Sequence, residues 1–147
     1  MAELLFDDIF MVKCVNPDGK KYDKVSRIEA RSEKLSMYML LDVNTEIYPI
    51  DEGEKILMVL SPTLNYDGAP VTSYTGQEGK KSLADKFEYI MHGKIYKLSD
   101  DGSGSDLKVE VYASFGGLQM LLKGDPIHCA KFRVDQNMFL LLRKQLT

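Results

Sequence analysis

Residues 111–124 read VYASFGGLQMLLKG, and the glycine pair at its centre decides how the fold is interpreted. A Walker-type phosphate loop needs G-x-x-x-x-G-K-[ST] between a strand and a helix. Here Gly117 and Gly124 do not have that spacing, and Lys123 precedes its glycine instead of following it. The stretch therefore does not indicate a nucleotide site.

The apolar residues of this stretch change parity across the glycines. They stand at odd positions before the pair and at even positions after it: Val111, Ala113, Phe115, Leu118, Met120 and Leu122. A one-residue change of phase in a strand-like run is what a β-bulge or a glycine bend produces. We therefore predict that Gly116 and Gly117 form a structural bulge at a barrel corner, with at least one of them in a conformation that would strain other residues.

The same period of two runs through most of the chain and indicates strands. Candidate strands cover residues 9–15, 24–32, 37–50, 54–61, 87–98, 107–115, 117–124 and 132–144. Within residues 37–50 the alternation predicts that Ile47 lies on the same face as Met39 and Leu41. Many short strands with little helical periodicity predict a mainly all-β fold, either an antiparallel barrel or a sandwich.

One long polar segment, residues 61–86, interrupts this rhythm and is rich in proline and glycine. A connection of that length within a compact domain is usually functional or disordered. Near its end, Ser82 followed by Asp85 predicts the cap of a short helix. No repeat and no interdomain linker is visible, so we expect residues 1–147 to form a single domain.

Composition excludes several classes of protein. Of the 147 residues, 44% are hydrophobic and 28% charged, which is not the composition of a disordered or fibrous chain. The net charge of -3 argues against binding nucleic acid or membranes by bulk charge. The apolar runs are too short to span a bilayer, and the start of the chain does not resemble a signal peptide. With two cysteines, a reducing intracellular compartment is expected.

No arrangement of side chains predicts catalysis, a metal or a cofactor. The imidazoles and thiols are His92, His128, Cys14 and Cys129, and they lack the spacing of a Cys2His2 zinc site. We interpret them as strand histidines and small buried cysteines. The paired carboxylates lie at turns and strand ends, where solvated faces explain them better than acid–base chemistry.

Residues 16–39 differ from the rest of the chain, because they hold six basic side chains against four acidic ones. Basic residues that follow a nucleic-acid backbone, with aromatic rings for the bases, are typical of sequence-tolerant single-strand binding by small barrels. An ordinary solvated strand face is the alternative interpretation. The candidate nucleic-acid-binding residues are Lys20, Lys21, Tyr22, Lys24, Arg27, Arg31, Lys34 and Tyr38.

Six blocks in this order resemble a known family over nearly the whole chain. They are LFDDIF (5–10), NPDGKKYDKVSRIEARS (16–32), LDVNTEIYPID (41–51), FEYIMHGKIYKL (87–98), YASFGGLQMLLKGD (112–125) and FRVDQNMFLLLRK (132–144). Together they are similar to the small eighth subunit shared by the eukaryotic RNA polymerases I, II and III. The blocks are long and ordered, so this likeness is more specific than any short motif.

The resemblance implies an antiparallel β-barrel related to the OB-fold, with a long Ω-type loop at about 61–86 and a few short helices. It implies a noncatalytic subunit in the nucleus, without a cofactor, docked mainly on the largest subunit of each polymerase. It also implies a nonspecific single-stranded DNA-binding region that matches residues 16–39. The alternative is a free-standing single-stranded nucleic-acid-binding module of the same fold.

Overall fold

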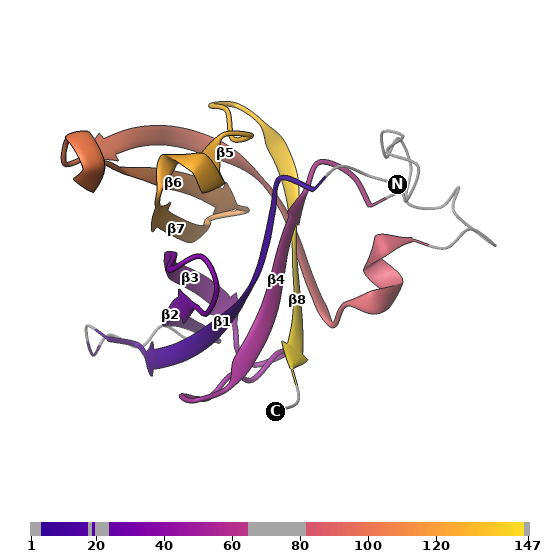
Figure 1. The fold of residues 1–147 in the computed structure, drawn as a ribbon. Helices are drawn as coiled ribbons and strands as arrows, with labels where there is room; N and C mark the ends of the chain where they lie inside the picture. Colours follow the sequence, from indigo (N-terminus) through magenta and orange to yellow (C-terminus); the bar gives the residue numbers. More distant parts are fainter. Residues whose placement is uncertain (1–3, 18, 20–23, 65–81, 146–147) are drawn as a thin grey trace.

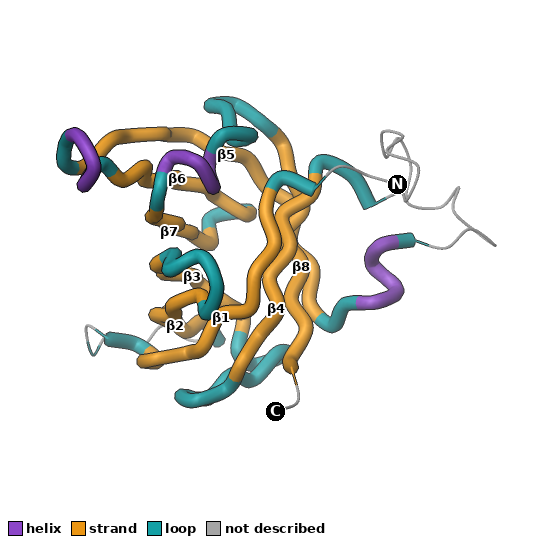
Figure 2. The backbone as a smooth tube through the Cα atoms, viewed as in Figure 1, coloured by secondary structure: helices purple, strands orange, loops and turns teal. Residues whose placement is uncertain are grey.

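The computed structural model describes residues 4–17, 19, 24–64 and 82–145, and its strands form a closed barrel (Figure 1). The strands are β1 (Phe6–Val15), β2 (Val25–Ser32), β3 (Tyr38–Asn44), β4 (Lys55–Ser61), β5 (Tyr89–Asp101), β6 (Lys108–Phe115), β7 (Leu118–Gly124) and β8 (Asn137–Gln145). The described helices are short 3-10 turns: η2 (Leu83–Lys86), η3 (Gly104–Asp106) and η4 (Pro126–Cys129). Figure 2 shows how the strands dominate the fold, as the alternating sequence predicts.

The order of strands around the barrel is β1-β2-β3-β7-β6-β5-β8-β4, and β4 pairs with β1 to close it. Neighbouring strands are antiparallel throughout. The prediction of an antiparallel barrel of the OB-like kind is therefore confirmed. The pairing of β3 with β7, from Tyr38↔Lys123 to Leu41↔Met120, joins segments far apart in the sequence. This seam positions the candidate site described below.

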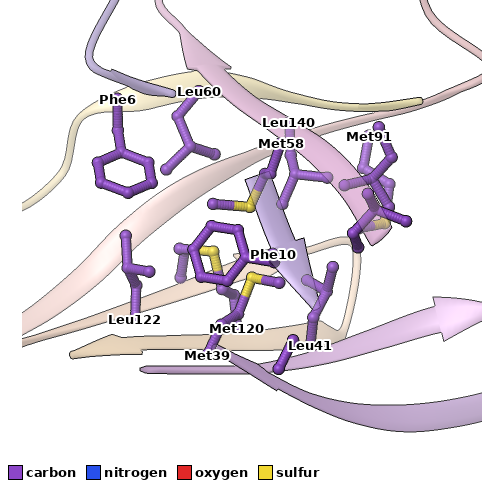
Figure 3. Packing of buried hydrophobic residues seen from close by; sticks show 14 of the residues in the cluster. Phe6, Phe10, Met39, Leu41, Met58, Leu60, Met91, Met120, Leu122 and Leu140 are labelled. Atoms are coloured by element: carbon purple, nitrogen blue, oxygen red, sulfur yellow. The ribbon is translucent and has the colours of Figure 1, made fainter. Parts of the chain in front are cut away.

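The barrel interior is filled by the inward-facing half of each alternating strand. Phe10, Met39, Met58 and Met120 meet there (Figure 3), and each is at most 1% exposed. Methionine is unbranched and adaptable, so it fills the irregular space of a small closed barrel without a fixed shape requirement. The interior is a packed core and not a channel.

The glycine pair is a hairpin turn, and the prediction of a bulge within one strand is wrong. β6 ends at Phe115, β7 begins at Leu118, and these two residues face each other across the turn. Two residues that pair across a two-residue turn are an odd number of positions apart. Residues on the same face of the hairpin therefore stand at odd positions before the turn and at even positions after it. The expected strain is confirmed, because Gly116 and Gly117 have φ of +64° and +99°. Such φ values are those of the hairpin turns that favour glycine.

The irregularities that bend the sheet lie in two other strands. The register shifts between Val12 and Cys14 in β1 and between Ile95 and Lys97 in β5. The first part of β1 pairs with β4 and its last part with β2. In the same way, the first part of β5 pairs with β8 and its last part with β6. An extra residue increases the local twist and bend that barrel closure requires.

The parity of Ile47 predicts that it lies on the inward face of β3, and this prediction is wrong. The strand ends at Asn44, and a turn follows in which the amides of Ile47 and Tyr48 donate to the Asn44 carbonyl, at 3.2 and 3.0 Å. Ile47 is therefore 70% exposed, whereas Met39 and Leu41 are fully buried. A two-residue period stops being informative where the backbone leaves the extended conformation.

Most of the predicted Ω-type loop lies outside the described residues. Its two ends are held together, since the Leu83 amide donates to the Leu64 carbonyl at 2.7 Å. The predicted helix cap is present at the start of η2. The Ala84 amide donates to Ser82 Oγ at 3.1 Å, and the Asp85 carboxylate accepts from the Ser82 amide at 3.0 Å.

Candidate interface on the outer β2–β3–β7–β6 face

The basic residues predicted from the sequence separate into two groups. Lys20, Lys21 and Tyr22 lie outside the described residues. The others are found before β2, along it, in the turn after it, and at the start of β3: Lys24, Arg27, Arg31, Lys34 and Tyr38. Of these, Arg27, Arg31 and Tyr38 come together on one outer face.

Arg27 is committed to an internal ion pair. Its Nε and Nη2 donate to the two carboxylate oxygens of Asp42 on β3, at 2.7 and 3.1 Å. Asp42 also accepts from the Gln119 amide on β7 at 2.9 Å, so one carboxylate connects three strands. Bidentate arginine–carboxylate pairs are strong and directional. We therefore interpret Arg27 as a positioning residue of the sheet, with little charge left for a phosphate.

Tyr38 and Arg31 form a second internal unit. The Arg31 guanidinium lies 5.1 Å from the Tyr38 ring centroid, and Tyr38 Oη donates to Glu29 at 3.0 Å. Burial raises the pKa of the Tyr38 hydroxyl, and the hydrogen bond to Glu29 raises that pKa further. The hydroxyl therefore stays protonated at neutral pH, and a cation occupies one face of the ring.

The remaining two cations are surface groups. Lys24 lies 3.9 Å from Glu46, and both side chains are more than half exposed, so the pair contributes little. Lys34 is exposed in the turn between β2 and β3. Among the described members of the predicted set, Lys34 and Arg31 are the cations without a carboxylate partner.

Two adjoining cavities, of about 350 and 250 Å³, run across this face. Both are lined by Leu40 and Leu121, which are directly paired between β3 and β7. We call the two together the Leu40–Leu121 groove. Its other lining residues are Arg27, Arg31, Ser36, Tyr38, Tyr96, Lys108, Glu110, Tyr112, Gln119, Met120, Lys123 and Gly124.

Sequence reasoning missed the half of this groove that β6 and β7 supply. The alternation does place Lys108, Glu110 and Tyr112 on one face of a strand, and Lys123 outward on the next. It does not reveal that β7 lies beside β3, because that pairing spans about half of the chain. The signal is present in each strand separately, and the topology combines the two halves.

Lys123 is neutralised within the groove wall. Its Nζ lies 2.6 Å from the Asp101 carboxylate and 4.0 Å from that of Glu110. The hydrogen bond to Asp101 raises the pKa of Lys123, and the same bond lowers the pKa of Asp101. Both groups are charged at neutral pH and nearly cancel each other's field.

The prediction of strand histidines and buried cysteines is confirmed for His92 in β5 and Cys129, and it is wrong for His128, which lies in η4, and for Cys14, which is half-buried. The exposed His92 packs on Phe139 with 4.6 Å between ring centroids. Cys129 is buried in η4, and burial raises the pKa of its thiol to about 11, so it is protonated at neutral pH. In the described part of the chain, no group of three or more His, Cys, Asp or Glu residues is arranged to hold a metal ion. No helix within it is long and apolar enough to cross a membrane.

Fold and site together define an OB-like barrel that presents an open surface groove. The sequence comparison specifies its kind further: the model of the RNA polymerase Rpb8 family matches residues 7–144, and the chain belongs to that family. The family resemblance expected from the six sequence blocks is thereby confirmed.

Named relatives match from end to end. The chain is 57% identical to "DNA-directed RNA polymerases II, IV and V subunit 8B" of Arabidopsis thaliana, over 96% of each chain. It is 43% identical to the probable RNA polymerases I, II and III subunit RPABC3 of Caenorhabditis elegans, over 98% of each. It is 36% identical to RPABC3 of Saccharomyces cerevisiae, over 98% of this chain and 100% of that one.

Proposed function

We propose that this chain is a noncatalytic structural subunit shared by the nuclear RNA polymerases I, II and III, docked mainly on the largest subunit. The observation that carries the proposal is the near full-length match to relatives named as subunits of several polymerases. The closed barrel with an outer groove is compatible with a role in assembly. A nuclear location follows from the same proposal.

Affinity purification from nuclei tests this function. We expect a tagged copy of the chain to recover the largest subunits of all three polymerases in comparable amounts. A Met58→Asp variant is the matched control, because a charge in the fully buried core should prevent folding and abolish recovery. Recovery of only non-polymerase partners would contradict the proposal.

The relatives differ in which polymerases their names mention, so the set of polymerases in the proposal needs a test of its own. The Arabidopsis relative is named for polymerases II, IV and V, whereas the nematode and yeast relatives are named for I, II and III. Quantifying each largest subunit in the same purification distinguishes these sets. Loss of polymerases I and III alone would restrict the function without removing it.

A second candidate function is nonspecific binding of single-stranded DNA by residues 16–39. Its support is Arg31 and Lys34, the two described cations of this segment that have no carboxylate partner. Alanine at Lys20, Lys21 and Lys24 should weaken binding of an oligo-dT probe and make its salt dependence shallower. If assembly is the main role, incorporation into polymerase should survive in this variant. A joint loss would favour a free-standing single-strand binder.

A further inference from the structure

The Leu40–Leu121 groove has an apolar floor on the outside of a barrel. Leu40 and Leu121 are half-buried and face each other across β3 and β7, with Tyr112 opposite Leu121 on β6. Directly opposed apolar side chains stabilise a sheet, but on an outer face they also remain partly in water. The two opposed leucines therefore offer a small apolar surface on which one apolar side chain of a partner can rest.

Some of the charged side chains around the floor are paired with each other, and, within the described ranges, those left without a partner of opposite charge are positive. Lys123 is held by Asp101 and Glu110, and Glu29 accepts from Tyr38. Arg31 on β2 and Lys108 on β6, which line opposite sides of the 350 Å³ cavity, have no carboxylate partner among the described residues. The groove is thus apolar at the centre and cationic on both flanks.

This pattern suits a peptide better than a nucleic acid. Stacking of bases needs open aromatic faces, and cations of the same chain already cover one face each of Tyr38 and Tyr112. In the second cavity, Tyr96 Oη donates to Gln119 Oε1 at 2.7 Å, and the Tyr96 ring lies 6.2 Å from that of Tyr112, centroid to centroid.

We propose that the Leu40–Leu121 groove binds an extended segment of another polymerase subunit in which an apolar side chain is flanked by Asp or Glu. The apolar side chain rests on Leu40 and Leu121. The flanking carboxylates pair with Arg31 and Lys108. This inference rests on the proposed function, because it takes the occupant to be a polymerase subunit.

Charge reversal tests the proposal in cells that carry the variant as their sole copy. We expect Arg31→Glu with Lys108→Glu to lower the amount of the chain per largest subunit in purified polymerase by about tenfold. The matched control is Lys13→Glu with Lys94→Glu, which changes the charge equally at exposed positions outside the groove. The control should stay within about twofold of the parent chain.

Folding is checked by the thermal midpoint of each purified variant. If the double glutamate variant does not fold, Arg31→Gln with Lys108→Gln removes the same pairs without repulsion and should lower incorporation by about threefold. Groove variants that incorporate as well as the control would overturn the inference and leave the proposed function intact. If the parent chain itself does not enter a polymerase, both proposals fail.

Cross-linking identifies the occupant. A photoreactive leucine analogue at position 121 in assembled polymerase should attach to a subunit peptide with an apolar residue beside Asp or Glu. The same analogue at position 127, which is exposed and outside the groove, should not yield that peptide. Attachment to nucleic acid, or to a basic peptide, would overturn the proposal. So would loss of oligo-dT binding by the glutamate variant with unchanged incorporation.

Discussion

Two outer faces of the barrel carry apolar residues, and the chain covers one of them itself. On the β4–β8 face, Val59, Leu64 and Leu141 form a buried cluster beneath residues of η2 and its neighbours, Leu83, Ala84 and Phe87. On the β3–β7 face, Leu40 and Leu121 form the floor of an open groove. The difference is that the chain covers the outward apolar residues of one face with its own segment and leaves those of the other face open to a partner.

The largest expected difference is in stability. Leu141→Ala should lower the free energy of unfolding by about 3 kcal/mol, because Leu141 is fully buried and leaves a cavity. Leu121→Ala in the open groove should cost about 1 kcal/mol or less, since this side chain is partly in water already. Urea unfolding of both variants measures the contrast. Equal costs would mean that the two faces are equally closed in the isolated chain.

Substitutions in the hairpin turn between β6 and β7 should have the next largest effect on stability. Gly116→Val and Gly117→Val each force a β-branched residue to positive φ and should cost about 1–3 kcal/mol. A side chain at either position would meet no neighbouring atom within 4 Å, so the cost is backbone strain alone. Asp-Gly in place of the pair suits a two-residue hairpin turn and should restore most of the urea midpoint. A valine pair as stable as the parent would contradict the turn assignment.

A pH effect on stability should arise at Glu88. Glu88 accepts hydrogen bonds from the Lys144 amide at 2.9 Å and from Tyr48 Oη at 2.7 Å, and these lower its pKa below the usual 4.5. A lowered pKa stabilises the fold above the unfolded-state pKa, and this contribution is lost as the pH falls through the folded-state value. The urea midpoint of Glu88→Gln should therefore fall less than that of the parent between about pH 5 and 3.

Glu52→Gln serves as the control for this pH effect, because Glu52 is exposed in a turn. The pH dependence of its urea midpoint is the baseline against which that of Glu88→Gln is compared. A parent and a Glu88→Gln variant with identical pH profiles would show that the carboxylate has the same pKa in the folded and unfolded chains.

The smallest effects concern the ion pairs of the open face. A double-mutant cycle on Arg27 and Asp42 should give a coupling energy of about 1 kcal/mol, because the pair is bidentate and Asp42 is only 8% exposed. The same cycle on Lys24 and Glu46 should give about 0–0.5 kcal/mol. Equal couplings would contradict the distinction between a positioning pair and a surface pair.

The strands were predictable because each has one buried face, and burial imposes a period of two on the sequence. The glycine pair shows the limit of that period. A bulge and a two-residue turn change the parity in the same way, so Phe115 and Leu118 could not distinguish them. Ile47 shows a second limit, because apolar and polar residues still alternate in the sequence after the strand has ended at Asn44.

The candidate site was only half predictable, for a reason of topology. Basic residues near Arg31 stand out as a cluster in the sequence. Lys108 and Leu121 do not, since they join that cluster only through the pairing of β3 with β7. Neither the ion pair of Arg27 nor the ring contact of Arg31 is visible before the fold is known. A count of cations therefore overestimates the charge that is free to bind.

The strand order also determines when the barrel can close during synthesis of the chain. β4 is flanked by β1 and by β8, and β8 is the last strand in chain order. While the ribosome is still upstream of Asn137, one side of β4 has no partner, and Met58 and Leu60 lack the strand that completes their enclosure. Barrels with such distant pairings fold slowly, and incomplete ones expose apolar surface to aggregation. Until residues up to Gln145 can pair with β4, the nascent chain therefore exposes apolar surface that is prone to aggregation.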